Sequence, residues 1–220
     1  MKRRLIPALL LAPCLQLAAA PLPAGWQDDM PTRVKALALL QSFNVTLLTQ
    51  PSATRTLQQW CADHQLAPGA RIVAVRDRTS AKAAGPQVRQ ALKVDGQTPL
   101  NYRRVQLHCG SKLLSEADNW YVPARLTSAM NHTLETSDLP FGTVVAPLHF
   151  SRRTLSATLL WQPLPPGWEN QPWQTASSSQ PLPVPQQLLQ HQAVLYREDG
   201  KPFSFVQETY QRDVLAFPLN

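Results

Sequence analysis

Two segments of the chain have the residue pattern of a β-hairpin, and they constrain the fold more than any other feature of the sequence. The first hairpin runs from Tyr102 to Val122 and turns at Gly110. The second runs from Ala193 to Tyr210 and turns at Asp199-Gly200, a dipeptide typical of tight hairpin turns. Valine, tyrosine and tryptophan favour strands on both sides of these turns. Because hairpins join antiparallel neighbours, the sequence predicts an antiparallel sheet.

Two helices are expected before the first hairpin. Thr32–Thr49 has apolar residues mostly at helical spacing. Ser52–His64 has a similar pattern, and either Ser52 or Thr54 could cap its first turn. The β-branched run Ile72–Val75 and the apolar stretch Val144–Trp161 supply the remaining strands. Two helices and about six strands joined largely by hairpins indicate an α+β fold, with one antiparallel sheet packed against flanking helices.

The N-terminal residues have the pattern of a secretory signal. Three basic residues at positions 2–4 precede an apolar stretch that ends at Leu17, and small residues follow it. We therefore expect a signal peptide over residues 1–24, a single domain over residues 25–220, and export to the periplasm or out of the cell. After the apolar stretch no run is long enough for a transmembrane helix, so no membrane association is expected once the signal is cleaved.

Charge excludes one class of partner. The whole chain carries 21 − 14 = +7, and without the three basic residues of the signal it carries 18 − 14 = +4. This mild excess has no dense run of lysine and arginine, so we expect no nucleic-acid partner. We expect a monomer.

The segment from 163 to 185 contains seven prolines and three consecutive serines. This composition predicts an extended surface loop. Such a loop could cover a pocket, recognise a partner through its prolines, or be a solvated excursion without a role.

Cys61 and Cys109 remain after Cys14 leaves with the signal. An even pair in an oxidising compartment allows a disulfide, and two buried thiols on separate elements are the alternative. The five histidines lack the spacing of a ligand pair. His108 and Cys109 are strand neighbours that point to opposite faces. We therefore expect no metal and no cofactor.

Strand alternation separates two adjacent arginines in the first hairpin. Arg103 shares a face with apolar residues and is interpreted as a charge at the end of a core-facing strand. Arg104 lies on the polar face in mid-strand, where an arginine in an enclosed layer needs an anion. Glu208 in the second hairpin could supply it, either as a structural partner or as a second catalytic group. The carboxylate of a ligand, which arginine grips through two hydrogen bonds, is the other possibility.

Four short motifs occur in a suggestive order: Arg104–Cys109, Pro140-Phe141-Gly142, Gly200-Lys201-Pro202, and Glu208 shortly after them. Together they resemble the chorismate pyruvate-lyase family and the UTRA ligand-binding domains that share its fold. The resemblance extends from about Leu47 to Leu215.

The resemblance implies a chorismate lyase-like domain, with a six-stranded antiparallel sheet, flanking helices and a buried ligand site. It implies that chorismate is converted to 4-hydroxybenzoate and pyruvate without a cofactor. Arg104 would bind a substrate carboxylate, and Glu208 would protonate the leaving enolpyruvyl group as an acid whose pKa is raised by burial. Phe141 and Gly142 would line the pocket, and Ala53 stands where the family has a substrate-lining methionine.

Asn119 and Arg125 flank the end of the returning strand and are further candidates for contacts with an anion. The implied partner is thus a small anionic ligand, a carboxylate. Three functions are compatible with the same fold: an exported lyase of the chorismate-lyase type, an exported non-catalytic binding protein for small aromatic carboxylates, and a structural domain with a vestigial site.

Overall fold

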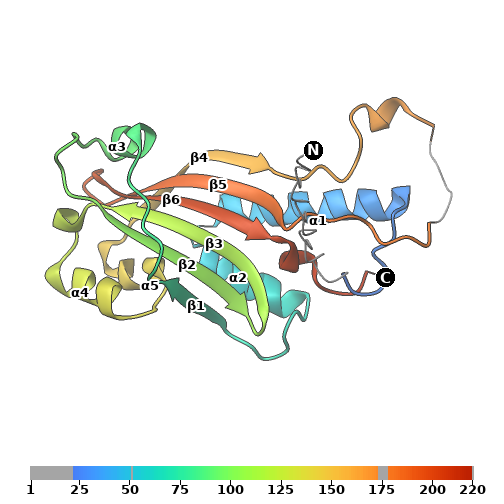
Figure 1. Cartoon of the computed structure of the whole chain (residues 1–220), viewed down its shortest axis with the longest axis horizontal. Helices are drawn as coiled ribbons and strands as arrows, with labels where there is room; N and C mark the ends of the chain where they lie inside the picture. The colour runs from blue at the N-terminus through green and yellow to red at the C-terminus, as the bar shows by residue number, and fades with distance from the viewer. Residues whose placement is uncertain (1–21, 51, 173–177, 220) are drawn as a thin grey trace, which may run out of the picture.

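The computed structural model of the chain describes residues 22–50, 52–172 and 178–219. The expected signal peptide lies outside these residues up to position 21. The described strands form one six-stranded sheet in the order β1-β2-β3-β6-β5-β4, with every neighbouring pair antiparallel (Figure 1). The strands are β1 Ile72–Asp77, β2 Asn101–Cys109, β3 Lys112–Tyr121, β4 Ser151–Leu159, β5 Gln187–Tyr196 and β6 Pro202–Gln211. The α+β class and the single antiparallel sheet with flanking helices are confirmed.

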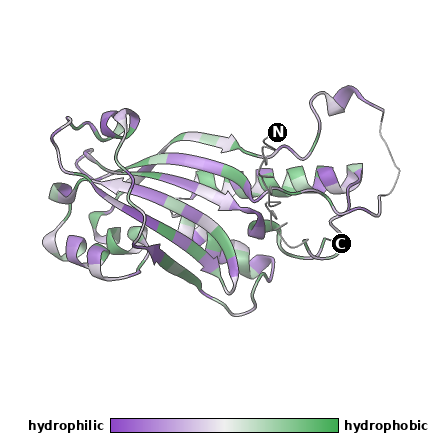
Figure 2. Ribbon diagram, viewed as in Figure 1, coloured by the Kyte–Doolittle hydropathy of each residue, from purple (hydrophilic) through white to green (hydrophobic). Residues whose placement is uncertain are grey.

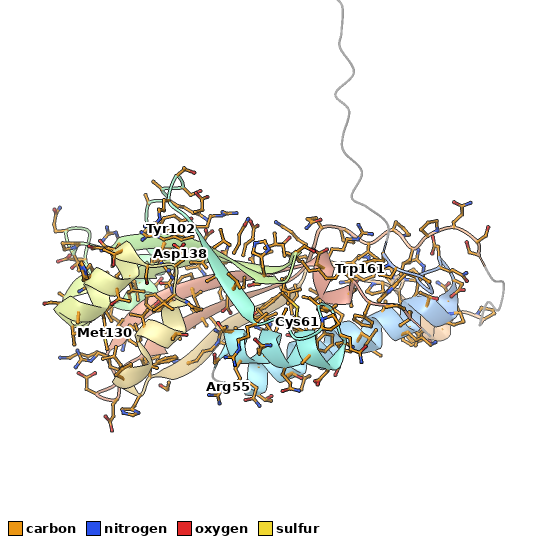
Figure 3. All side chains as sticks on the ribbon, turned by 90° about the horizontal axis from the view of Figure 1, so that it is seen from below. Arg55, Cys61, Tyr102, Met130, Asp138 and Trp161 are labelled. Carbon is orange, nitrogen blue, oxygen red and sulfur yellow. A yellow bond between two sulfur atoms is a disulfide. The ribbon has the colours of Figure 1, made fainter. Side chains whose placement is uncertain are left out.

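Two long helices cover one face of this sheet, which we call the inner face. They are α1, Met30–Thr49, and α2, Ala53–Asp63, and both contribute to the largest buried apolar cluster together with β2 and β6 (Figure 3). Phe43 of α1 contacts the rings of Trp60 and Tyr210, at centroid distances of 4.7 and 5.3 Å. Burying apolar area of this kind is the main favourable contribution to folding.

The opposite, outer face is covered at one end by the short helix α3, Pro86–Leu92. Trp120 and Phe205 pack there against Val88 and Leu92. Along the strands, hydrophobic and hydrophilic residues alternate, as the banded colouring of the ribbon shows (Figure 2). The same alternation places Arg103 and Arg104 on opposite faces of the sheet, as expected from the sequence.

The connection from β3 to β4 carries the chain from the middle of the sheet to its far edge. It contains α4, Ser128–Thr136, and the single-turn helix α5, Phe141–Val144. We call residues 137–150 the flap, because this stretch places Phe141 and Phe150 against inner-face residues of the sheet.

Several element boundaries differ from the expected ones. The stretch Val144–Trp161 was expected to hold one or two strands, and it holds one, β4 at Ser151–Leu159. The residues before β4 form the end of α5 and a 3-10 turn. Helix α3 was not expected, since its seven residues are too few to show a periodicity. The proline-rich segment is a loop where it is described, interrupted by a 3-10 turn at Trp168–Asn170, and its residues 173–177 lie outside the described residues.

Cys61 and Cys109 form a disulfide, with their Cα atoms 6.3 Å apart, so the first of the two alternatives for this pair holds. The bond joins α2 to the end of β2, across a sequence separation of 48 residues. Both cysteines are buried in the main apolar cluster.

We expect the double variant Cys61→Ser, Cys109→Ser to lose roughly 2–4 kcal/mol of unfolding free energy, because the unfolded chain regains the freedom of the closed loop. Urea unfolding followed by tryptophan fluorescence measures the loss. Wild type in dithiothreitol is the matched control and should shift by the same amount. Equal midpoints for the variant and oxidised wild type would show that the bond does not stabilise the fold.

Candidate functional site

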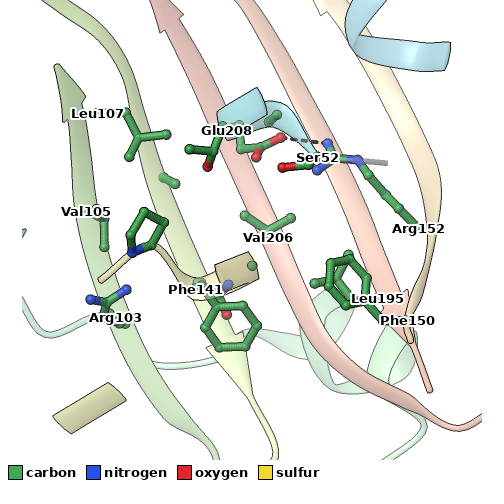
Figure 4. Close-up of a pocket in the computed structure, with 16 residues that line it drawn as sticks. Ser52, Arg103, Val105, Leu107, Phe141, Phe150, Arg152, Leu195, Val206 and Glu208 are labelled. Carbon is green, nitrogen blue, oxygen red and sulfur yellow. Dashed lines mark hydrogen bonds and ion pairs between the residues drawn. The ribbon is translucent and has the colours of Figure 1, made fainter. Parts of the chain in front are cut away.

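A small cavity opens on the inner face, between the start of α2 and the flap (Figure 4). Its volume is about 80 Å³. The N-terminal end of α2 forms one wall, the sheet forms the floor, and the flap closes the other side. The lining residues are Ser52, Ala53, Thr54, Arg103, Val105, Leu107, Ala117, Asn119, Pro140, Phe141, Gly142, Phe150, Arg152, Leu195, Val206 and Glu208.

Ser52 fixes the start of α2 at this cavity, as expected of a capping residue. Its side chain accepts a hydrogen bond from the backbone N–H of Arg55, at 3.3 Å. Helix α2 is therefore held with its first turn toward the sheet, and Ala53 and Thr54 line the cavity.

Glu208 and Arg152 form a buried ion pair beside the cavity. Arg152 Nη2 lies 2.6 Å from Glu208 Oε2, and both side chains are about nine-tenths buried. Burial alone raises the pKa of Glu208, but the charge and hydrogen bond of Arg152 outweigh it and lower the pKa below the usual 4.5. Glu208 is therefore ionised at neutral pH. Its contribution to stability is present above about pH 4.5 and is lost as the pH falls through its lower folded pKa.

Two further buried groups support Glu208. The hydroxyl of Tyr210 donates to Glu208 Oε2 at 3.1 Å, and burial together with the nearby carboxylate raises the pKa of Tyr210 well above 10. His191 pairs directly with Glu208 across β5 and β6, and one of its ring nitrogens shares a hydrogen bond with Asn44 of α1 at 2.8 Å. Burial lowers the pKa of His191 to about 4, so this ring is neutral at pH 7.

Arg103 is the second arginine of the cavity, and it has no carboxylate partner within hydrogen-bonding distance in the described part of the chain. The residue is 1% exposed. Its Nη2 donates to the carbonyls of Ser137 and Leu139, at 3.2 and 2.8 Å, while Nε and Nη1 are buried without a partner. Burial, followed by repulsion from Arg76, lowers the pKa of Arg103 to about 10, which leaves it charged at neutral pH.

The flap explains why a charged guanidinium is tolerated at this position. The last carbonyls of a helix have no partner inside the helix and carry partial negative charge. Arg76 donates to the carbonyls of Leu134 and Glu135 at the end of α4. Arg103 donates to the carbonyls of Ser137 and Leu139 at the start of the flap. The C-terminal end of α4 and the flap are thus held to the sheet by arginines.

Arg104 lies on the opposite face, so its expected convergence with Glu208 is wrong. It contacts Glu116 at 3.2 Å and Asp118 at 3.5 Å on the outer face, where it is about one-third exposed. Val105, next in sequence, is the residue of β2 that shares the row of Ala117 and Glu208 on the inner face. The carboxylates that Arg104 requires are therefore structural, and they come from β3.

The other expected site residues divide into two groups. Phe141, Gly142 and Ala53 line the cavity, as does Asn119, whose Oδ1 already accepts a hydrogen bond from Ser204 at 2.8 Å. Arg125 lies elsewhere: it donates to the backbone carbonyls of Leu92 and Pro202 and joins α3 to the start of β6.

Two arginines of the site, Arg103 and Arg152, were missed by sequence reasoning. Arg103 could have been found, because a charged side chain on an otherwise apolar strand face is costly unless something pairs with it. Arg152 gave no such signal. It lies near Glu208 because β4 follows β6 and β5 in the order of the strands, and this order cannot be read from the residues around Arg152.

Within residues 22–50, 52–172 and 178–219, no three histidine, cysteine or acidic side chains come together as a metal site would require. No helix of the described chain is long and apolar enough to cross a bilayer.

Comparison with known proteins identifies a relative of similar length. The uncharacterized protein y4mC of Sinorhizobium fredii is 50% identical over 194 residues, which cover 88% of this chain and 82% of that protein. No family model matches the sequence.

Solved structures share the fold at low sequence identity. PhnF from Mycobacterium smegmatis matches with a TM-score of 0.50 and 14% identity, over 77% of this chain and 68% of PhnF. The ligand-binding domain of a putative GntR-family transcriptional regulator from Bordetella bronchiseptica matches with a TM-score of 0.43 and 15% identity, over 67% and 86% of the two chains. The possible transcriptional regulator YydK from Bacillus subtilis matches with a TM-score of 0.42 and 12% identity, over 69% of this chain. The matched part is 63% of YydK, so this chain spans less than two thirds of that protein. Of these three matches only that to PhnF reaches a TM-score of 0.50, and at 14% identity it shows the fold alone.

We expect Arg152→Met and Glu208→Gln each to cost about 3–5 kcal/mol of unfolding free energy. The reason is that the first leaves the buried Glu208 carboxylate without its cation, and the second leaves the buried Arg152 guanidinium without its anion. The double variant should lose clearly less than the sum, since it leaves no unpaired charge. Urea unfolding of all four proteins closes the cycle. Arg104→Met, which breaks a partly exposed pair, serves as the control and should cost about 1 kcal/mol or less. Additive losses would mean that the two side chains do not stabilise each other.

Proposed function

This chain belongs to the family of y4mC from Sinorhizobium fredii, and we propose that it is an exported binding protein for a small carboxylate. Family membership brings no activity with it, so the proposal rests on the cavity. The fold match to PhnF and the resemblance to UTRA domains are compatible with ligand binding on this sheet.

The guanidinium of Arg103, which has no carboxylate partner among the described residues, carries the proposal. A buried N–H group without an acceptor costs free energy, and Arg103, which lines the cavity, has two nitrogens, Nε and Nη1, without an acceptor among the described residues. A carboxylate accepts two parallel hydrogen bonds from a guanidinium and neutralises its charge. Nε and Nη1 lie on different edges of the guanidinium, so a carboxylate bound at either edge would accept from one of them and neutralise the charge of Arg103.

The charge state of Glu208 favours binding over lyase chemistry. Elimination of pyruvate from chorismate calls for a protonated acid at the leaving oxygen. Burial would keep such a carboxyl protonated, but Arg152 and Tyr210 stabilise the charged form of Glu208. In this role Glu208 is an acceptor of hydrogen bonds, which suits recognition of a ligand.

Export is supported by two independent observations. The N-terminal residues have the pattern of a signal peptide. The disulfide between Cys61 and Cys109 is of a kind that persists in oxidising compartments. We therefore propose that the ligand is met in the periplasm or outside the cell.

We expect carboxylates to raise the melting temperature of the purified protein, and Arg103→Met to abolish this shift. Acetate, butyrate, succinate and 4-hydroxybenzoate sample size and charge in thermal-shift and calorimetric titrations. Arg104→Met is the matched control, because it removes the neighbouring arginine on the other face and should bind as wild type does. Arg103→Lys, which keeps the charge but loses the paired donors, should bind about tenfold or more weakly. Equal loss in both Met variants would refute a role for Arg103 in recognition.

We expect no release of pyruvate from chorismate above the background of Glu208→Ala. The reason is that an ionised Glu208 cannot donate the proton that the leaving group needs. A lactate dehydrogenase-coupled assay measures the product. Pyruvate release by wild type that disappears in Glu208→Ala would support the lyase function instead.

A further inference from the structure

We infer that the outward face of helix α1 is the interface of a homodimer, in which a second copy of the chain packs the same face of its own α1 against it in antiparallel orientation. This face, which we call the α1 stripe, consists of Val34, Ala38, Gln41, Val45 and Leu48. No residue of α1 lines the cavity, so the inference does not depend on the proposed binding function. It replaces the monomer expected from the sequence.

Helix α1 is apolar on two opposite sides. It lies in the helical layer on the inner face of the sheet, and the side toward the sheet is buried, with Leu40 and Phe43 fully so (Figure 3). The side away from the sheet would be polar in an ordinary surface helix. Val45 and Leu48 lie on it instead, with 55% and 44% of their surface exposed. A helix that is apolar on both sides is normally buried on both sides, so the outward side is suited to a partner.

The α1 stripe carries no charge. The sequence from Ala36 to Thr54 contains no lysine, arginine, aspartate or glutamate, whereas about a quarter or more of an ordinary protein surface is charged. A helix that lies on a membrane has a strongly charged polar face opposite its apolar one, and the opposite face of α1 is the protein core. The missing charge therefore favours a protein surface that is equally uncharged, and the stripe of a second copy meets this condition.

The spacing of the stripe is self-complementary. Its members are separated alternately by four and three residues, which is the spacing of helices that pack side by side. An antiparallel copy that places Ala38 opposite Leu48 also places Gln41 opposite Val45, because both pairs are centred on the level of Phe43. The small Ala38 then faces a large side chain. The two Gln41 amides lie about one helical turn apart near the symmetry axis, where they can hydrogen-bond to each other.

The ends of α1 favour the antiparallel orientation. Its last turn contains no basic residue, and the last carbonyls of a helix carry partial negative charge. In the alignment centred on Phe43, Lys35 of each copy lies beside the C-terminal end of the other α1. A parallel pair would instead bring the two Lys35 side chains together.

Sedimentation velocity tests the dimer. One helix face is smaller than the interface of an obligate dimer, so we expect the oxidised protein to dimerise with a dissociation constant of about 1–100 µM. Val45→Glu together with Leu48→Glu should weaken the dimer about a hundredfold or more, because carboxylates would be buried without partners. Val73→Glu together with Val75→Glu is the matched control. These valines of edge strand β1 are 56% and 47% exposed, and their replacement should leave the dimer unchanged.

One further variant should shift the equilibrium in the opposite direction. A polar residue in the seam between two helices fixes their alignment at a cost in stability. Gln41→Leu should therefore tighten the dimer about tenfold. A poorly folded variant would not give this result, and circular dichroism verifies the fold of each protein.

Cysteine cross-linking tests the orientation. A mixture of Ala38→Cys and Leu48→Cys should form a disulfide-linked heterodimer under mild oxidation, because these positions face each other. Leu48→Cys alone should not, since its two copies lie about 15 Å apart along the helix axis. The native cysteines, Cys61 and Cys109, are paired and buried, so they do not compete. Efficient cross-linking of Leu48→Cys with itself would overturn the antiparallel arrangement.

Three other outcomes would overturn the inference. The first is a wild type that stays monomeric up to about 1 mM. The second is binding of the wild type to phosphatidylcholine vesicles that the glutamate variant of the stripe has lost, which would assign the face to a membrane. The third is a dimer that survives the glutamates in α1 and is lost with those in β1, which would assign the interface to the edge strand.

Discussion

The cavity depends on a guanidinium that is buried without a carboxylate. Arg103 is held on the inner face by two flap carbonyls, so the flap and the sheet meet at a charged group rather than at an apolar one. A buried cation that is only partly satisfied is costly. The fold therefore carries a local deficit of negative charge, and the rest of the site is arranged around it.

Glu208 shows how a neighbour decides what a carboxylate can do. Buried among Tyr210, His191 and apolar residues, this group would be protonated and could act as an acid. The guanidinium of Arg152 reverses that outcome, and it comes from the edge strand β4, far from Glu208 in the sequence. Whether the carboxyl at this position is neutral or charged thus depends on one residue from another strand.

Local sequence patterns predicted much of the fold and only part of the site. The hairpins follow from their turn residues and strand-forming residues, and α1 and α2 follow from helical spacing. Ser52 was one of two expected caps of α2, because capping is a local effect. Which arginine of the Arg103-Arg104 pair faces the cavity depends on which face of the sheet the helices cover, and long-range packing decides that. Arg152 depends on the order of strands in the sheet, which no short window of sequence contains.

The disulfide makes the two sides of the cavity unequal. One wall begins at α2 and the floor includes β2, and the bond between Cys61 and Cys109 ties these two elements together covalently. The flap wall is held by hydrogen bonds, ring contacts and the apolar packing of Val145, and no disulfide ties it to the sheet among the described residues. The wall at α2 is therefore the more rigid of the two. For the binding function proposed above, a wall that is already fixed lowers the ordering cost of association.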